Sequence, residues 1–328
     1  MKLALTLAIT STLVLAGCAA VTDQIADRRE VEAETRFPPG GDLIDVGNGR
    51  NVHAFVTGEG PDLILIHGAS GNTRDFTFRF TGRMGENYRT IVLDRPGLGW
   101  SDRADAAYED PFNPNAETPR EQARMLKAAA DKLGVQNPII LGHSYGAAVA
   151  LAWALEFPDH PAGLVIVSGA TEPWPGELGA LYRINGTALG GATLPPLVTA
   201  YAPRTLLPSI VERIFAPQAV PEGYRDYVGA GLSIRRSAIR ANGRQVAQLK
   251  RDVTEMAPNY AAIDMPVEIV HGAEDPIVPP DIHALPLFLR IEGATLQILD
   301  GIGHMPHHVA PEAVEAAIDR AADRAGLR

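Results

Sequence analysis

The sequence predicts an α/β protein with a mostly parallel sheet between layers of helices. Three apolar runs of strand length, residues 62–66, 138–141 and 267–272, each lead into a turn of glycine or polar residues. A helical pattern follows the second run, over residues 147–157. Continuous apolar runs of this length are typical of strands that bury both faces, as the strands of a parallel sheet do.

The turn after the second run carries the motif G-x-S-x-G at residues 142–146, with Ser144 at its apex. A sharp turn between a strand and a helix needs glycine at both flanks, because a Cβ there would clash with the neighbouring backbone. Such a turn exposes the serine hydroxyl, and the helix that follows directs its N-terminal amides at developing negative charge. We therefore predict that Ser144 is a nucleophile.

A serine nucleophile needs a base within hydrogen-bond reach and an acid that orients the base. After a turn of this kind the acid and then the histidine follow the serine along the chain. Asp275 lies just after the predicted strand 267–272, and His304 just after another, 294–299. Both positions are at the carboxyl ends of strands, where open α/β sheets place their chemistry. We predict Asp275 as the orienting acid and His304 as the general base.

Two other carboxylates compete with Asp275 for the role of the acid. Glu274 is its neighbour, but the step from Asp275 to proline fits a turn at a strand end better. Asp300 lies close to His304 in sequence and is better placed to cap its own loop.

His307 and His308 follow His304 at helical spacing and raise the alternative of a metal site. The chain has neither an H-E-x-x-H motif nor a pair of cysteines to support that interpretation. We predict no metal and no cofactor.

The oxyanion of an acyl intermediate needs two backbone amides. One is predicted to be that of Tyr145, directly after the nucleophile, and the other that of a residue in the loop after an early strand. In that loop Gly68 allows the backbone to turn so that the amide of Ala69 points into the site. His67 and His143 are expected to brace the neighbouring loops.

These segments together resemble the serine α/β-hydrolase superfamily, in the branch with one lid insertion that includes esterases, carbon–carbon bond hydrolases and cofactor-free haloperoxidases. The resemblance rests on His67-Gly68, residues 94–101, residues 142–146, Asp275-Pro276 and Gly303-His304. It implies an α/β-hydrolase fold, with a mostly parallel eight-stranded sheet and a helical cap after strand six. Related epoxide hydrolases and dehalogenases carry an aspartate nucleophile, so Ser144 argues against both chemistries. Asp94 and Arg95 are expected to be structural.

The spacing of the predicted elements divides the chain into a signal peptide (1–17), a tether (18–41), a hydrolase core (42–171 and 259–328) and a helical cap (172–258). The cap fills the long interval between the sixth predicted strand and the next, where proline and glycine separate helical patches. Its candidate pocket residues, for which packing between cap helices is the alternative, are Trp174, Tyr182, Leu197, Tyr201 and Phe215.

The first residues resemble a bacterial lipoprotein signal, with a basic start, an apolar stretch over residues 3–15 and the sequence Leu-Ala-Gly-Cys that ends at Cys18. The resemblance implies cleavage before Cys18 and lipidation of its thiol, and Cys18 is the only cysteine in the chain. Ala19 in place of an aspartate implies an outer-membrane location facing the periplasm. A plain secretory peptide and an uncleaved anchor remain alternatives.

The net charge of −10 and the absence of a basic stripe disfavour nucleic acid as a partner. We expect a small acyl substrate instead, with the membrane as a second partner through the lipid anchor. The predicted activity is that of an esterase that hydrolyses carboxylic esters through an acyl-enzyme. A carbon–carbon bond hydrolase or haloperoxidase (perhydrolase) with the same triad, and an inactive lipid-anchored binding protein, are the alternatives.

Overall fold

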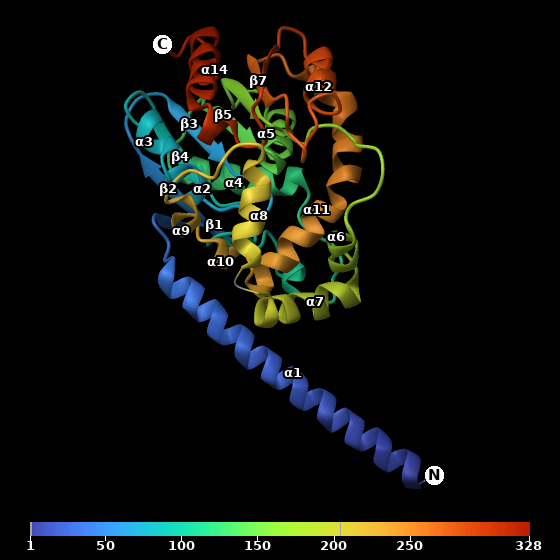
Figure 1. Cartoon of the computed structure of the whole chain (residues 1–328). Helices are drawn as coiled ribbons and strands as arrows, with labels where there is room; N and C mark the ends of the chain where they lie inside the picture. Colours follow the sequence, from blue (N-terminus) through green and yellow to red (C-terminus); the bar gives the residue numbers. More distant parts are fainter. Residues whose placement is uncertain (1, 204) are drawn as a thin grey trace.

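The computed structural model describes residues 2–203 and 205–328, and their side chains from residue 16 onward. Met1 and the side chains of residues 2–15, which carry most of the predicted signal peptide, lie outside that description. A sheet between layers of helices forms the body of the molecule, and one long N-terminal helix projects from it (Figure 1).

The sheet has eight strands in the order β1-β2-β4-β3-β5-β6-β7-β8. β2 is antiparallel to β1 and β4, and the other pairs are parallel. The strands are β1 (Asp42–Gly47), β2 (Arg50–Thr57), β3 (Asp62–Ile66), β4 (Arg89–Leu93), β5 (Ile139–His143), β6 (Gly163–Val167), β7 (Val267–Gly272) and β8 (Thr295–Leu299). The predicted fold class is confirmed.

Helices cover both faces of the sheet because its central strands are apolar on both sides. Along β3, Ile64 and Ile66 belong to one buried cluster, whereas Leu63 and Leu65 belong to another. The first cluster includes α4 (Pro119–Lys132) and α5 (Tyr145–Glu156), and the second includes α3 (Phe80–Met84) and α14 (Pro311–Arg324). The remaining core helices are α2 (Arg74–Thr77), α12 (Ala284–Arg290), α13 (Pro306–Val309) and the short 3₁₀ turns η1 (Ala106–Glu109) and η2 (Ala257–Ala262).

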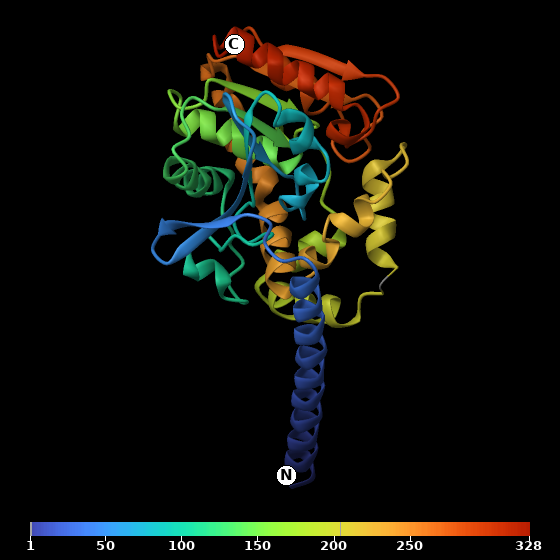
Figure 2. The ribbon, with the colours of Figure 1, turned by 90° about the vertical axis from the view of Figure 1, so that its left-hand side faces the viewer.

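Six helices lie between β6 and β7, inside the interval 172–258 that the sequence assigns to a cap. They are α6 (Ala180–Asn185), α7 (Ala188–Tyr201), α8 (Leu206–Phe215), α9 (Tyr224–Tyr227), α10 (Ala230–Ser233) and α11 (Arg236–Met256). Of these, α6 and α7 lie at the end of the body opposite α14 (Figures 1 and 2).

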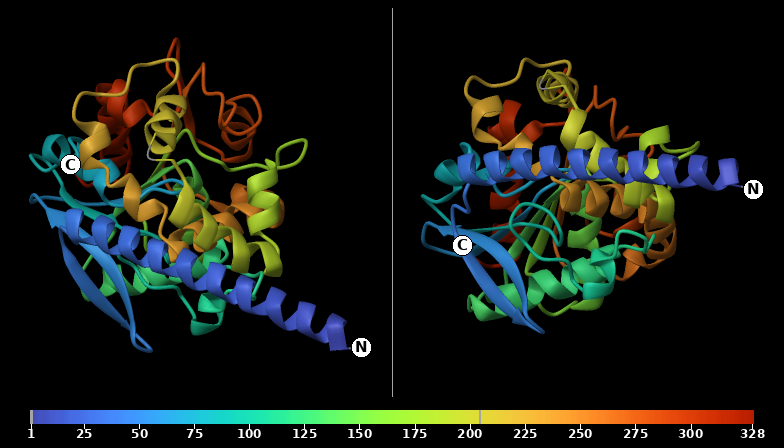
Figure 3. Two further views of the ribbon diagram at one scale, coloured as in Figure 1. Left: turned by 60° about the horizontal axis from the view of Figure 1, so that its bottom comes forward. Right: turned by 90° about the horizontal axis from the view of Figure 1, so that it is seen from below.

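The segment predicted as a tether is mostly helical, because α1 (Lys2–Arg36) continues through it. α1 lies across the cap, as the view from below shows (Figure 3). Thr22, Ala26 and Ala33 form its buried face, at positions that recur on one side of a helix. The prediction of a tether misses this contact because the segment is polar. Its acidic side chains form ion pairs with a cap residue far along the chain, which the local sequence does not reveal. Among the described residues, no helix combines the length and the apolar character needed to cross a membrane.

Candidate active site

Ser144 occupies the turn between β5 and α5 in a strained backbone conformation, with φ 53° and ψ −119°. A Cβ at position 142 would lie 2.4 Å from the carbonyl oxygen of Gly146, and one at position 146 would lie 2.3 Å from that of Ile66. Only glycine fits at either position, so the physical reason for the G-x-S-x-G spacing is confirmed. Strain held at a single serine by packed neighbours is a common feature of functional sites.

The loop after β3 lies directly against this serine. A Cβ on Gly68 would be 3.0 Å from the Cβ of Ser144 and 3.5 Å from its Oγ. Ala69 follows Gly68, and Tyr145 is the first residue of α5. Of the two residues predicted to donate to an oxyanion, Tyr145 directly follows the serine and Ala69 directly follows the glycine that lies against it.

Asp275 and His304 meet beyond the ends of β7 and β8. The Nδ1 of His304 lies 2.7 Å from Oδ2 of Asp275, and both side chains are buried. The amides of Ile277 and Val278 donate to the other oxygen, Oδ1, at 2.9 and 3.0 Å. The carboxylate is thus held by its own turn and presents its other oxygen, Oδ2, to the imidazoles of His304 and His271.

The environment of Asp275 keeps it ionised. Burial raises the pKa of this carboxyl, but hydrogen bonds from His271 and His304 outweigh burial and hold the pKa well below its usual range. The two rival acids, Glu274 and Asp300, are exposed. The structure therefore brings Asp275, rather than either rival, into contact with His304.

His143 connects the serine turn to the loop of His304. Its Nε2 donates to the backbone carbonyl of His304 at 2.9 Å, and the two rings lie 4.9 Å apart between centroids. Burial, together with the neighbouring imidazoles of His307 and His304, lowers the pKa of His143 well below its ordinary value, so the ring is neutral. His143, the residue before Ser144, therefore holds the loop of His304 against the serine turn, in agreement with its predicted bracing role.

His67 braces the loop on the other side of the site. Its Nδ1 donates to the carbonyl of Gly68 at 2.9 Å, and its Nε2 accepts the amide of Arg95 at 3.0 Å. The guanidinium of Arg95, fully buried, also donates to the carbonyl of Gly68 at 3.2 Å and lies 4.0 Å from the centre of the Tyr145 ring. Burial and the charge of Arg95 lower the pKa of His67 to about 4. These contacts support the structural roles expected for His67 and Arg95.

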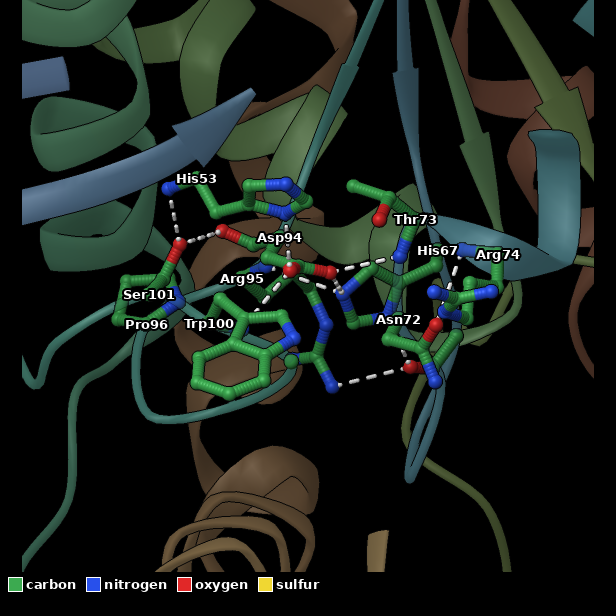
Figure 4. A network of polar contacts seen from close by, with 12 residues as sticks. His53, His67, Asn72, Thr73, Arg74, Asp94, Arg95, Pro96, Trp100 and Ser101 are labelled. Atoms are coloured by element: carbon green, nitrogen blue, oxygen red, sulfur yellow. Dashed lines mark hydrogen bonds and ion pairs between the residues drawn. The ribbon is translucent and has the colours of Figure 1, made fainter. Parts of the chain in front are cut away.

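Asp94 organises the same region from the end of β4 (Figure 4). Its carboxylate accepts hydrogen bonds from the amides of Thr73 (2.6 Å) and Trp100 (2.9 Å) and from Nδ1 of His53 (2.7 Å). The oxygens of this fully buried group are thereby occupied by the protein itself. Asp94 is a structural residue, as expected.

A second buried cluster joins Asp75, on α2, to the cap and to His307 and His308 on α13, the pair weighed above as a metal site. Nothing in the sequence indicated the part that Asp75 plays. Asp75 accepts from the hydroxyl of Tyr224 at 2.7 Å, from Nε2 of His308 at 2.8 Å and from Nε2 of His307 at 3.3 Å. The ligand atoms of Asp75, His307 and His308 lie within 4.8 Å of one another, close enough to hold a metal ion. In this structure hydrogen bonds among these residues already occupy the carboxylate. Three segments separated by many residues make the cluster, so no local motif could have revealed it.

The cap is fastened to both loops of the site. The side chain of Asn242, on α11, accepts the amide of Ser70 at 2.7 Å, and Gln218 accepts the amide of Gly303 at 3.0 Å. Ser144 is 8% exposed and His304 is 4% exposed. The cap and loops thus shield the catalytic groups from bulk water.

The predicted pocket residues of the cap have different locations. Leu197 and Tyr201 are half exposed on α7, and the hydroxyl of Tyr201 lies 3.0 Å from that of Thr22 on α1. The spacing of apolar residues shows which side chains share a face of a helix, but not which face meets the core. Phe215 is buried against Tyr224 and His308, and the Trp174 ring lies 6.1 Å from that of His283.

The order of the strands and the serine turn after β5 are those of the α/β-hydrolase fold. The chain belongs to the Alpha/beta hydrolase family, whose model matches residues 63–317. It is 27% identical over 273 residues to the 2-hydroxy-6-oxononadienedioate/2-hydroxy-6-oxononatrienedioate hydrolase of Klebsiella pneumoniae, covering 80% of this chain and 83% of the relative. It is 30% identical over 268 residues to the magnesium-chelatase 30 kDa subunit of Rhodobacter capsulatus, covering 79% and 86%. The esterase EaEST of Exiguobacterium antarcticum shares the fold, with a TM-score of 0.67, 20% identity, and coverage of 86% and 99%.

Proposed function

We propose that this α/β hydrolase is a serine esterase that cleaves carboxylic esters through an acyl-enzyme. The observation that carries the proposal is the hydrogen bond of 2.7 Å between Asp275 and His304, whose backbone carbonyl accepts a hydrogen bond from His143, the residue before Ser144. A buried acid–imidazole pair next to an activated serine is the arrangement that nucleophilic acyl transfer requires.

In the first half of the reaction, Oγ of Ser144 attacks the ester carbonyl while Nε2 of His304 takes the hydroxyl proton. The carbonyl oxygen becomes an oxyanion, which the amides of Ala69 and Tyr145 stabilise. The intermediate collapses when His304 gives the proton to the alkoxide, and the alcohol leaves. Asp275 stabilises the imidazolium that exists between these two transfers.

In the second half, water attacks the acyl group on Ser144. His304 takes a proton from the water and returns it to Oγ, so the carboxylic acid is released and the serine is restored. Both halves use the same oxyanion site, because the same carbonyl oxygen becomes negative each time. The overall reaction consumes one ester and one water and needs no cofactor.

A carbon–carbon bond hydrolase is the second candidate, because the Klebsiella relative is named for a 2-hydroxy-6-oxo-dienedioate substrate. The same triad would serve, with a carbon acid in place of the alcohol as the leaving group. A series of p-nitrophenyl esters of increasing chain length, run beside a 2-hydroxy-6-oxo-dienoate, separates the two candidates by kcat/KM. A fluorophosphonate probe run in parallel tests whether the serine is activated at all. Failure to label Ser144 or to turn over any substrate would favour an inactive binding protein.

We also propose that Cys18 is lipidated and holds the enzyme on the outer membrane, facing the periplasm. Two observations support this: Cys18 follows the Leu-Ala-Gly sequence of a lipoprotein signal, and its thiol is free and exposed. Several acyl chains hold a protein at a membrane where one would not, because each buried methylene contributes about 0.8 kcal/mol. Mass spectrometry of the mature N-terminus tests the proposal. An unmodified terminus at Ala19 or later, or an intact Met1, would refute it.

A further inference from the structure

Helix α7 of the cap presents a row of large apolar side chains that are half exposed or more in the described structure. Leu189, Leu197 and Tyr201 are 69%, 50% and 52% exposed, and their spacing of eight and four residues puts them on one side of the helix. Thr193 completes the row, and its hydroxyl donates to the carbonyl of Leu189. The opposite side is buried, at Gly191, Pro195 and Thr199, and the small residues Gly190 and Ala200 are buried near the two ends of the row.

This row faces the end of α1 that carries Cys18. The hydroxyls of Tyr201 and Thr22 lie 3.0 Å apart, and that of Thr22 donates to the carbonyl of Cys18 at 2.9 Å. Cys18 is therefore about one helical turn, roughly 5 Å, beyond the contact with α7. Val21, 54% exposed, lies next to this contact. Leu189 and Leu197 share the side of Tyr201, and α7 lies at the end of the body from which the N-terminal part of α1 projects (Figure 1).

The direction of α1 relative to the cap is fixed by charged contacts. Arg236, at the start of α11, forms ion pairs with Asp23, Asp27 and Glu30 on three successive turns of α1. Arg29 donates to the carbonyls of Thr199 and Ala202 at the end of α7, at 3.2 and 2.8 Å. A membrane that holds Cys18 would therefore face a defined surface of the cap.

We infer that the surface formed by Leu189, Leu197, Tyr201 and Val21, here called the α7 patch, lies against the lipid bilayer to which Cys18 is anchored. The inference rests on the lipid anchor and esterase activity proposed above. A bilayer is the favoured occupant for two reasons. The proposed anchor residue, Cys18, lies about one helical turn from the patch, and leucine and tyrosine side chains suit a membrane–water boundary. The net charge of −10 disfavours an anionic surface.

The substrate class follows from this placement. α7 packs on α6 and α11 in the cap that covers Ser144. A cap held on the bilayer gives the site access to esters dissolved in the lipid, whose apolar acyl chains keep them out of water. The enzyme should therefore favour long-chain esters presented in a bilayer.

The first test measures the contact itself with a fluorescent probe. Lipidation consumes the only thiol of the chain, so Leu197→Cys creates a single site for a dye in the lipidated full-length protein. Leu289→Cys, on α12 at the other end of the molecule and 73% exposed, is the matched control. In phosphatidylcholine vesicles with nitroxide-labelled acyl chains, the dye at 197 should lose most of its fluorescence and the dye at 289 should lose little. Equal quenching at the two positions would overturn the inference.

The same experiment separates the other occupants and the underlying proposals. If the dye at 197 is shielded in detergent and the shielding rises with protein concentration, a second copy of the chain covers the patch. That result would overturn the inference of a bilayer contact. Failure to float with vesicles would overturn the anchor and the inference together. The dye can also be attached at position 197 in a Ser144→Ala variant, which lacks the proposed nucleophile. Quenching therefore reports on the contact of the patch with lipid even if the esterase proposal fails.

The second test measures the substrate class. Leu189→Asp with Leu197→Asp should reduce turnover of a long-chain ester in vesicles by roughly tenfold, because two charges oppose contact with the lipid. Turnover of soluble p-nitrophenyl acetate should not change, and Leu289→Asp should leave both rates unchanged. Equal losses on both substrates, or no loss on either, would overturn the proposed substrate class.

Discussion

Replacing Asp275 by asparagine exchanges one oxygen for an amino group and should reverse the hydrogen bonding of the His304 ring. The amides of Ile277 and Val278 both donate to Oδ1, so the amide oxygen of the variant must stay on that side. The amino group then takes the place of Oδ2, 2.7 Å from Nδ1 of His304. A donor in that place requires Nδ1 to accept, which puts the proton of the neutral ring on Nε2.

A ring protonated at Nε2 cannot accept the proton of Ser144, so the loss falls on kcat. We expect a decrease of about 10²–10⁴-fold, by analogy with other serine triads in which the acid becomes an amide. This corresponds to about 3–5 kcal/mol in the activation barrier. The fold should persist, because the two backbone hydrogen bonds of the turn and the volume of the side chain are kept.

The assay is kcat and KM for a soluble p-nitrophenyl ester, with circular dichroism to verify folding. Glu274→Gln is the matched control, since Glu274 is adjacent but exposed. Its activity should equal that of the unaltered enzyme. A folded Asp275→Asn variant with nearly full kcat, or a large loss in Glu274→Gln, would refute the assignment of the acid.

Three further predictions concern the surroundings of the site. Gly68→Ala should lower kcat about tenfold or more with the fold retained, because the added methyl meets Ser144 at 3.0 Å and displaces an oxyanion donor; unchanged kcat would contradict the placement of that loop. His67 and His307, whose burial lowers each pKa to about 4, stay neutral in the folded chain. The unfolded chain protonates them near pH 6.5, so stability in urea should be full above that pH and fall as the pH drops toward 4; a flat profile from pH 7 to 4.5 would contradict this. Arg236→Ala should cost about 1 kcal/mol, since the pairs are partly exposed, and should speed trypsin cleavage of α1 without changing kcat on soluble esters; cleavage at the original rate would contradict the docking of α1.

The parts of the site that could be predicted from sequence are those set by local backbone requirements. Ser144 is marked by glycines that its turn needs, and Asp275 and His304 by their places just after apolar strands. The fold class followed from the same apolar strands and the turns after them. These features depend on a few consecutive residues, so a single sequence contains them.

The features that sequence did not predict depend on contacts between distant segments. The cluster of Asp75 with His307 and His308 joins positions more than 230 residues apart. The docking of α1 depends on Arg236, which lies 206 residues along the chain from its partner Glu30. Tyr201 was a candidate for either a pocket or packing between cap helices, and its hydroxyl lies 3.0 Å from that of Thr22 on α1. Tertiary packing decides the partner of each helix face.

The measurement that tests the central proposal most directly is covalent labelling by a fluorophosphonate, followed by mapping of the adduct by mass spectrometry. An activated serine beside an oxyanion site attacks phosphorus as it attacks a carbonyl. We predict one adduct, on Ser144, and no adduct in Ser144→Ala. Ester turnover in that variant should fall on the order of 10⁴–10⁶-fold. Labelling at another residue, or undiminished turnover by Ser144→Ala, would contradict the serine mechanism.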